Sequence, residues 1–273
     1  MMQTPPVLTD LAALRRNRAR ARDPFLHAEA VADVQERLSE VNKAFTAPAV
    51  VTAFAEPWLG ALPGARVVAE AEVLALEPGT QDLVIHALGL HWANDPVGQL
   101  VQCRRALRPD GLLLAPLFGG QTLHELRSAL AQAEAEVTGG LSPRVLPMAE
   151  IRDLGGLVQR AGLALPVADS FVKRVMYRDI FHLMRDLREM GEANALAARL
   201  RRPTRRAVFE RAGEIYRETW GVADRIPATF EIITLTGWAP DDSQQQPLRP
   251  GSAQTLLAEA LTSATARRDD ARG

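Results

Sequence analysis

The sequence predicts an α/β protein with an open, mainly parallel sheet and helices on both faces. Apolar segments of strand length alternate with segments of helical periodicity through the middle of the chain, as a parallel sheet with crossover helices requires. One of these segments, Asp82–Ala87, is apolar enough for a strand buried on both faces. With 273 residues, 47% hydrophobic and 24% charged, the chain can bury a full core without disulfide bonds or a structural metal.

Two helices are expected at the beginning of the chain. Leu8–Ala21 has leucines on one face and arginines on the other, and Ala28–Val41 carries apolar residues at helical spacing. Prolines then interrupt the chain repeatedly. Between two of them, Ala49–Phe54 fits either a short strand or a helical turn, and periodicity does not decide between them.

The central part of the chain is predicted to alternate between strands and helices. Ala65–Glu70, Asp82–Ala87 and Leu112–Leu117 are the first three expected strands. Pro96–Leu107 is expected to be a helix, because proline suits the first turn. A Pro-Asp-Gly turn separates this helix from the third strand.

Helices dominate the second half of the predicted fold. A fourth strand, Val167–Val175, and a final alternating strand, Thr229–Gly237, are separated by helices. The expected helices of this half are Thr122–Val137, Ala149–Ala161, Asp179–Met190, Ala193–Leu200 and Arg205–Trp220.

The predicted elements divide the chain into three parts. Residues 1–48 form an N-terminal helical segment, and residues 49–238 form the α/β domain with a helical insert at 178–221. Residues 239–273 are rich in Gln, Pro and Asp and are expected to be a loose tail, with a short helix near Ala253–Leu261.

Charge and cysteine content exclude several classes of function. The net charge is -1, so no global field favours nucleic acid, and no nucleic-acid partner is expected. Cys103 is the single cysteine and cannot form an internal disulfide or a Cys-rich zinc site. The five histidines show no metal-ligand spacing, so no metal site is predicted. The run Arg199–Arg206 fits acidic or nucleic-acid partners, but a solvated helix end is the commoner explanation of such runs.

The N-terminus lacks the apolar segment of a secretory signal. Five arginines lie between Arg15 and Arg22, as in some mitochondrial transit peptides, but Asp10 and Asp23 flank them. We therefore expect a basic surface helix in a cytoplasmic protein of the bacterial type, with a peripheral position at the inner membrane as a variant. No segment approaches the roughly 20 apolar residues of a transmembrane helix.

Two passages resemble the class I S-adenosylmethionine (SAM) methyltransferases. Ala69–Pro96 is similar to the passage in which a strand ends at an acidic residue, a Pro-Gly turn follows, and the chain continues through D-L-V to H-W. Ala106–Gly120 is similar to the superfamily's L-K-P-G-G turn and the strand after it. The resemblance implies a Rossmann-like fold with an antiparallel last strand and SAM as cofactor.

Within this superfamily the chain resembles two neighbours. Tyr177–Asn194 is similar to the malonyl-carrier methyltransferases of biotin synthesis. The more specific resemblance is to the methyltransferase-fold assembly factors of respiratory complex I, and with it the likeness covers nearly the whole chain after Val31. The stretches that carry it are Phe118–Leu130, Gly139–Arg144, Arg152–Leu163 and Pro227–Ala253.

The family's glycine-rich cofactor loop is missing from this sequence. Family members bind SAM at D-x-G-x-G-x-G after the first strand, where glycines let the backbone approach the ligand. Only Gly60 and Gly64 precede Glu70 in this region, and Pro57-Trp58 stands where the loop belongs. By resemblance Ala65–Glu70 matches the family's third strand. We therefore expect an N-terminally truncated sheet of about five strands with extra helices.

Five residues are the candidates for what remains of a cofactor site. By resemblance, Glu70 is the acid that accepts the adenine amino group, although a strand-end glutamate is more often simply solvated. His86, Leu90, His91 and Trp92 follow the Asp82–Ala87 strand, at the carboxyl end where such sheets bind ligands. For His86 and Trp92, core packing is the alternative.

Two functions remain open from the sequence. One is a catalytically silent descendant, or pseudoenzyme, that assists assembly of a respiratory NADH dehydrogenase by binding one of its subunits. The other is an active SAM-dependent methyltransferase acting on a small molecule, a carrier protein or a protein. Methyl transfer needs mainly proximity and orientation, so few catalytic side chains are required and none is assigned.

Overall fold

The computed structural model describes residues 7–244 of the chain. Met1–Pro240 group into one compact unit and Asp241–Gly273 into a second. Within the second unit, Ser243 donates hydrogen bonds from its backbone N and its Oγ to Asp241 Oδ1. The short helix expected near Ala253–Leu261 lies outside the described residues.

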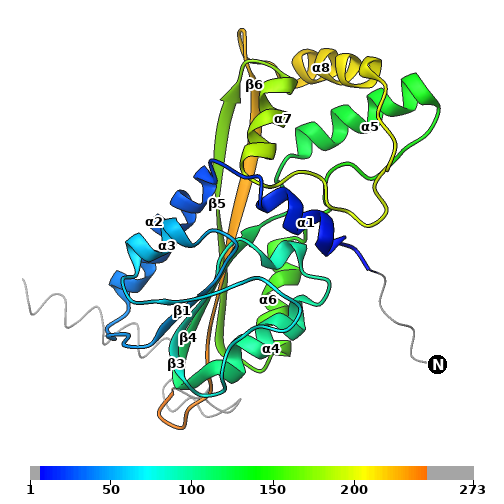
Figure 1. The fold of residues 1–273 in the computed structure, drawn as a ribbon. Coiled ribbons are helices and arrows are strands. Elements are labelled where there is room, and N and C mark those ends of the chain that lie inside the picture. Colours follow the sequence, from blue (N-terminus) through cyan, green and yellow to red (C-terminus); the bar gives the residue numbers. More distant parts are fainter. Residues whose placement is uncertain (1–6, 245–273) are drawn as a thin grey trace, which may run out of the picture. The chain divides into compact units, whose positions relative to one another are not determined.

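A six-stranded sheet forms the centre of the first unit (Figure 1). Its strand order is β2-β1-β3-β4-β6-β5, and the three contacts among β2, β1, β3 and β4 are parallel, whereas β6 runs antiparallel to both β4 and β5. The antiparallel last strand expected from the sequence is confirmed. The strands are β1 (Pro48–Val51), β2 (Arg66–Val68), β3 (Gln81–His86), β4 (Leu107–Phe118), β5 (Ala164–Tyr177) and β6 (Ile226–Trp238).

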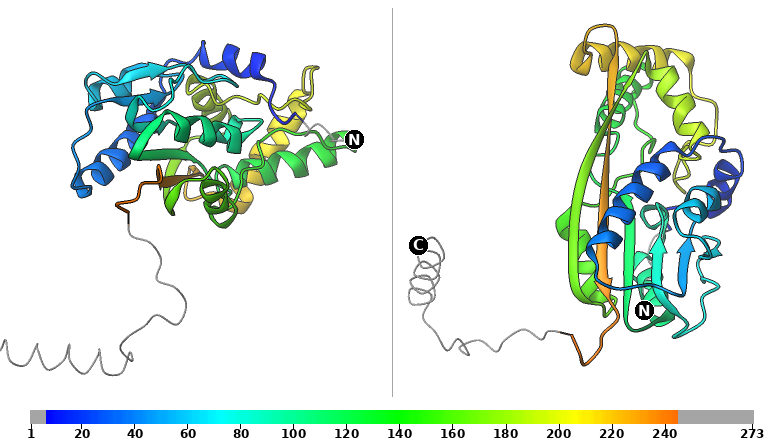
Figure 2. Two further views of the ribbon diagram at one scale, coloured as in Figure 1. Left: turned by 90° about the horizontal axis from the view of Figure 1, so that it is seen from below. Right: turned by 90° about the vertical axis from the view of Figure 1, so that its left-hand side faces the viewer.

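Helices cover both faces of the sheet, as the alternating sequence pattern predicts (Figures 1 and 2). One face packs against α2 (Phe25–Glu40) and α3 (Ala55–Ala61), and the other packs against α4 (Pro96–Ala106) and α6 (Ile151–Arg160). Consecutive strand residues alternate between these two cores: Ile85 faces α2, while Val84 faces α4.

Strand β1 decides the question that periodicity left open. Its backbone pairs with β2 on one side and β3 on the other, and Ala49, Val50 and Val51 are completely buried. The sheet therefore has six strands, so the expectation of about five was one strand too few. Four residues between prolines and a turn are too short to show a period, which is why the sequence could not assign them.

The expected helix Ala193–Leu200 does not form. Leu196 instead makes an isolated antiparallel bridge with Thr9, and Ala197 donates its N–H to the Leu8 carbonyl at 2.8 Å. The Asn194 side chain accepts from the Leu196 N–H at 3.0 Å, a local bond that competes with helix formation. Pairing with the N-terminal segment overrides the helical propensity of this alanine-rich stretch.

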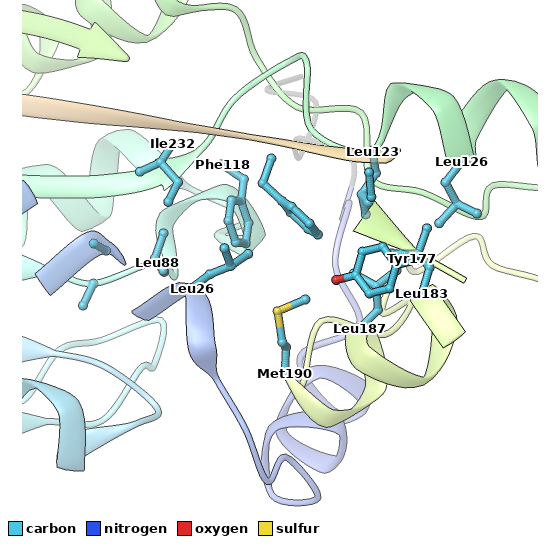
Figure 3. Packing of buried hydrophobic residues seen from close by; sticks show 14 of the residues in the cluster. Leu26, Leu88, Phe118, Leu123, Leu126, Tyr177, Leu183, Leu187, Met190 and Ile232 are labelled. Atoms are coloured by element: carbon cyan, nitrogen blue, oxygen red, sulfur yellow. The ribbon is translucent and has the colours of Figure 1, made fainter. Parts of the chain in front are cut away.

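Strands β5 and β6 are longer than predicted, and they carry a second group of helices at one end (Figure 1). This group comprises α5 (His124–Thr138), α7 (Ile180–Glu189) and α8 (Arg206–Trp220). Their apolar sides join the core on the α2 face, where Phe118, Leu126 and Leu187 converge (Figure 3).

The N-terminal helix α1 (Leu11–Arg18) packs against the site rather than against the sheet. Ala13 and Leu14 form a small apolar cluster with Trp92, Leu146 and the 195–196 segment. The Asp10 side chain caps the helix by accepting from the Ala13 N–H at 3.0 Å. This placement brings the arginine-rich helix to the carboxyl ends of the parallel strands.

Candidate functional site

A cavity of about 690 Å³ lies at the carboxyl ends of β1, β2 and β3. Its wall includes residues at or just after the ends of these strands, such as Thr52, Glu70 and His86. The opposite wall comes from α1, through Leu11, Leu14, Arg15, Arg18 and Ala19. Open parallel sheets bind ligands at this edge, and the volume lies in the range of small-molecule sites.

Arg18 is the central charged group of this cavity. Its guanidinium forms ion pairs with Glu70 and Glu192, and it donates to the Leu88 carbonyl at 3.1 Å. Only 5% of the Arg18 side chain is exposed, and the guanidinium carbon lies 6.0 Å from the centre of the Phe54 ring. Two carboxylates, a carbonyl and a ring face thus surround one buried cation.

The ionisation of the two carboxylates differs because their surroundings differ. Burial raises the pKa of Glu70, although Arg18 opposes this effect. Burial also opposes ionisation of Glu192, but Arg18 and the bonds from His91 and Trp92 outweigh it and lower the pKa of Glu192 to about 2. Glu192 is therefore the fixed anion of the cluster.

Glu70 retains an unused acceptor. One oxygen pairs with Arg18, whereas Oε1 is buried without a hydrogen-bond partner in the described part of the chain. A Cβ added to Gly89 would lie 2.3 Å from this oxygen, so a side chain at position 89 would force the Glu70 carboxylate to move.

His86 lies at the end of β3 and lines the cavity. Its Nε2 is 3.3 Å from Gln99 Oε1, and its Nδ1 has no partner among the described residues. Burial lowers the pKa of His86 to about 4, so the ring is neutral near pH 7. A neutral imidazole can donate from one nitrogen and accept at the other.

The other three predicted residues belong to a short 3-10 turn, Leu90–Trp92. Trp92 lines the cavity and donates from Nε1 to Glu192 Oε2 at 2.6 Å. His91 is buried, with Nε2 3.4 Å from the same oxygen, and burial lowers its pKa. Leu90 is 1% exposed and packs in the core on the α4 face, and it is not part of the cavity wall.

A second, smaller cavity of about 230 Å³ adjoins the first. Trp92 lines both cavities, and Glu192, the ion-pair partner of Arg18, lines the smaller one. Its wall is mainly apolar and comes from β4, β6, α5, α7, α8 and the segments around residues 144–148 and 190–194, besides Trp92. Figure 3 shows part of this wall, including Phe118, Leu123, Leu126, Leu187 and Met190.

Sequence reasoning predicted Glu70, His86, His91 and Trp92, which the structure brings together, but it missed Arg18, Glu192 and Gln99. Arg18 was one of five arginines in a run, and nothing in the run distinguishes it. The available signal was its position on the helix, because Arg18 follows Leu11 and Leu14 at helical spacing on the apolar face. The cofactor roles of the five predicted residues stay predictions.

Within residues 7–244, no three metal-binding side chains lie close enough together to hold an ion. Over the same residues, no helix combines the length and apolar character needed to cross a bilayer.

Comparison with known families identifies a methyltransferase domain over residues 25–115. This match includes β1, β2, β3 and most of β4, together with Glu70 and His86. It therefore covers the strands whose ends form the larger cavity.

The curated relatives extend the similarity along the chain. A Dictyostelium discoideum protein described as "Arginine-hydroxylase NDUFAF5, mitochondrial" is 43% identical over 70% of this chain and 44% of its own length. The human protein of the same description is 40% identical over 72% of this chain and 57% of its own length. A malonyl-[acyl-carrier protein] O-methyltransferase of Xylella fastidiosa is 34% identical over 65% of this chain and 58% of its own length.

The chain thus spans about half the length of the curated relatives it matches. The expected cytoplasmic location of the bacterial type is contradicted, because the matching NDUFAF5 proteins are described as mitochondrial. The cytoplasmic expectation rested on the two aspartates that flank the arginine run, and local charges of this kind do not determine a protein's compartment.

A solved structure of a methyltransferase from Bacillus halodurans covers 77% of this chain at 12% identity with a TM-score of 0.48, a likeness too low to add to the assignment. The matched domain, the sheet order and the curated relatives agree with the resemblance found in the sequence. The chain belongs to the class I SAM-dependent methyltransferase superfamily.

Proposed function

We propose that the protein acts in the assembly of respiratory complex I, as a methyltransferase-fold protein with a degenerate cofactor site and an NADH dehydrogenase subunit as its partner. The observation that carries this proposal is the larger cavity, which has the acid at the end of β2 but no glycine loop after β1. The NDUFAF5 relatives support the assembly role. Arginine hydroxylation, which their description assigns to them, is not part of the proposal for this chain.

The residues present fit the adenine end of SAM. Glu70 Oε1 is a buried acceptor without a partner at the cavity wall, and an exocyclic amine is a donor of matching chemistry. Trp92 and the neutral His86 supply flat surfaces on the same wall. When bound, SAM supplies an electrophilic methyl group on its sulfonium.

In this proposal, the other half of a usual SAM site is missing. The chain leaves β1 through Thr52-Ala53-Phe54 and enters α3, a helix of only seven residues without a side-chain cap. Between β1 and β2 the chain has only the isolated Gly60 and Gly64, so no run of glycine N–H groups follows β1. Losing three or four such hydrogen bonds removes roughly 3–5 kcal/mol of binding free energy.

Calorimetric titration with SAM tests the degenerate site. A loss of that size turns a dissociation constant of a few micromolar into one near a millimolar. We expect no detectable binding by the isolated protein at about 100 micromolar ligand. A one-to-one titration with low-micromolar affinity would overturn the degenerate-site proposal.

At higher SAM concentration, the Glu70→Gln variant tests whether the Glu70 carboxylate contributes to SAM binding. We expect SAM binding to weaken by roughly 1–3 kcal/mol, because a donor is then left without its anionic acceptor. Glu72→Gln is the matched control, since Glu72 lines the same cavity but is exposed. Equal affinities for the two variants would remove Glu70 from the site.

An active SAM-dependent methyltransferase is the second candidate. The unpartnered Glu70 oxygen and the apolar cavity beside Trp92 favour it, as does the malonyl-[acyl-carrier protein] O-methyltransferase relative. Methyl transfer from labelled SAM to a carrier protein or a complex I subunit distinguishes this candidate from a silent binding protein.

The assembly role has a test that does not depend on SAM. Host cells lacking the gene should accumulate partly assembled NADH dehydrogenase on native gels, and the wild-type gene should restore the complete complex. Normal levels of assembled complex in the deletion strain would contradict the role in assembly.

A further inference from the structure

Two arginine runs, far apart in the sequence, lie side by side in the fold. The antiparallel bridge between Thr9 and Leu196 brings α1 against the segment that continues to Arg202. Asp10 then holds this segment, because its carboxylate accepts from Arg199 at 2.9 Å and from Arg201 at 3.4 Å. Figure 1 shows α1 beside the segment that precedes α8.

The outer arginines of this surface have no described ion pairs. Arg15, Arg16, Arg20 and Arg22 are exposed, and so is Arg202; over residues 7–244 none of them makes a side-chain ion pair or hydrogen bond. The acids nearby do not neutralise them: Asp10 is already paired with Arg199 and Arg201, and Glu192 is buried against Arg18. Asp23 is the exposed acid that remains next to the run. We call these five arginines the basic surface.

The basic surface borders the larger cavity and is joined to α7, the helix that lines the smaller one. Arg15 lines the larger cavity, and Arg188, on the helix that precedes the 193–202 segment, lines the smaller one. Backbone N–H groups of Arg22 and Asp23 bond to the Glu189 carbonyl at 2.8 and 3.1 Å, which ties the end of the α1 run to the end of α7. A partner bound here would therefore lie beside the larger cavity.

We propose that the basic surface is a docking site for an acidic polypeptide segment of a partner protein. Guanidinium groups match carboxylates in planar, two-point hydrogen bonds, and a chain of net charge -1 gains such a field only by gathering arginines locally. The inference stands whether or not SAM binds.

An acidic protein fits this surface better than nucleic acid or a membrane. Single-stranded nucleic acid needs aromatic side chains on which bases stack, and α1 and the 193–202 segment contain none. Membrane-surface helices insert an apolar face, but Ala13 and Leu14 of α1 are buried within the protein. Charge is therefore the feature of the five arginines that recognises the partner.

The test measures fluorescence anisotropy of a labelled ten-glutamate peptide with the full chain at about 50 mM salt. Arg15→Glu/Arg16→Glu/Arg20→Glu should weaken binding about ten-fold or more. Arg105→Glu/Arg152→Glu/Arg160→Glu carries the same change in net charge on exposed arginines of α4 and α6, and it should weaken binding less than about three-fold. Amide hydrogen exchange should slow in α1 and residues 193–202 when the peptide binds.

Several results would overturn the proposal. They are an absence of binding at low salt, equal losses in the two triple variants, or protection from exchange elsewhere. Tighter binding of a 20-nucleotide RNA or of vesicles containing anionic lipid would assign the surface to those partners instead. If the glutamate variant fails to fold by circular dichroism, Arg15→Gln/Arg16→Gln/Arg20→Gln replaces it, with the matched glutamine control. Because no cofactor or activity is involved, failure here leaves the proposed function untouched.

Discussion

The two adjoining cavities are built in opposite ways. The larger one lies at the ends of parallel strands. Arg18 and Glu70 of its buried ion cluster line the wall, and Glu192 is the second partner of Arg18. The smaller one is enclosed by helices and lined mainly by Leu, Met and Phe side chains. They meet at Trp92, which lines both and donates to Glu192.

The two cavities are therefore stabilised by different interactions. The polar cavity depends on hydrogen bonds and charge pairing, so removing one partner leaves another buried and unsatisfied. The apolar cavity depends on packing, so its stability follows side-chain volume. Variants in the two cavities should therefore differ in their response to pH as well as in size of effect.

The largest expected effect comes from Arg18→Leu. Removing the guanidinium leaves Glu70 and Glu192 close together without their shared cation, and breaking a buried pair in this way costs about 3–5 kcal/mol. The free energy of unfolding, measured by urea denaturation at pH 7, should fall by this amount. Arg15→Leu, on the same helix but exposed, should change it by no more than about 0.5 kcal/mol.

Adding Glu70→Gln to Arg18→Leu sharpens this result. The second substitution removes one of the two stranded charges, so part of the lost stability should return. If the double variant is less stable than Arg18→Leu alone, the cost of losing Arg18 is one of packing rather than of charge.

Leu126→Ala tests the apolar cavity. Leu126 is 3% exposed and lines the smaller cavity from α5, so truncation should lower the free energy of unfolding by about 2–4 kcal/mol. Leu126→Met keeps most of the volume and should cost less than about 1.5 kcal/mol. Equal losses for the two would show that shape rather than volume governs this wall.

The third expected effect is a loss of stability below neutral pH. Burial lowers the pKa of His86 from its ordinary 6.5 to about 4. Between these values the unfolded chain binds a proton that the folded chain does not, so stability falls as the pH falls from about 6.5 towards 4. At pH 5 the loss from His86 is about 2 kcal/mol, and the pKa of His27 is lowered in the same direction.

His86→Gln isolates this contribution, because its unfolding free energy should change less between pH 7 and pH 5 than that of the wild type. Glu192 acts only at lower pH, because its pKa is lowered to about 2. Glu70 acts in the opposite sense, since its raised pKa lets the folded state take up a proton first. A wild-type profile that is flat from pH 7 to pH 5 would contradict burial of neutral histidines.

The smallest expected effect is at the edge of the polar cavity. Asp95 caps α4 by accepting from the Gly98 N–H at 2.7 Å and lines the larger cavity. Asp95→Ala should cost about 1 kcal/mol, whereas Asp95→Asn retains a capping oxygen and should cost a few tenths. Denaturation of the two variants side by side measures the difference.

Much of the polar cavity could be predicted from sequence. Apolar runs in the sequence indicate the strands, and the residues at the ends of parallel strands share one edge of the sheet. This reasoning led to Glu70, His86 and Trp92, which line the cavity. Leu90 was predicted together with them, but the 3-10 turn places it in the core on the α4 face rather than in the cavity wall. A turn of three residues is invisible to periodicity.

The apolar cavity could not be predicted, because its walls come from six separate parts of the chain. Each of those residues reads as ordinary core in its own helix. Arg18 and Glu192 were not predicted as site residues for a related reason. A charged residue within a charged stretch of sequence is usually expected at the surface. Their pairing depends on tertiary contacts between segments that no local pattern connects.

The Arg18 cluster also has a consequence for the order of folding. Arg18 pairs with one carboxylate 52 residues further along the chain and with another 174 residues further along. During synthesis, α1 therefore emerges long before its full set of counter-charges exists, and such distant contacts are the slowest to form. A nascent chain shorter than 192 residues lacks the Glu192 carboxylate that pairs with Arg18. We therefore expect α1 to dock late in folding and to complete the site after the rest of the unit has formed.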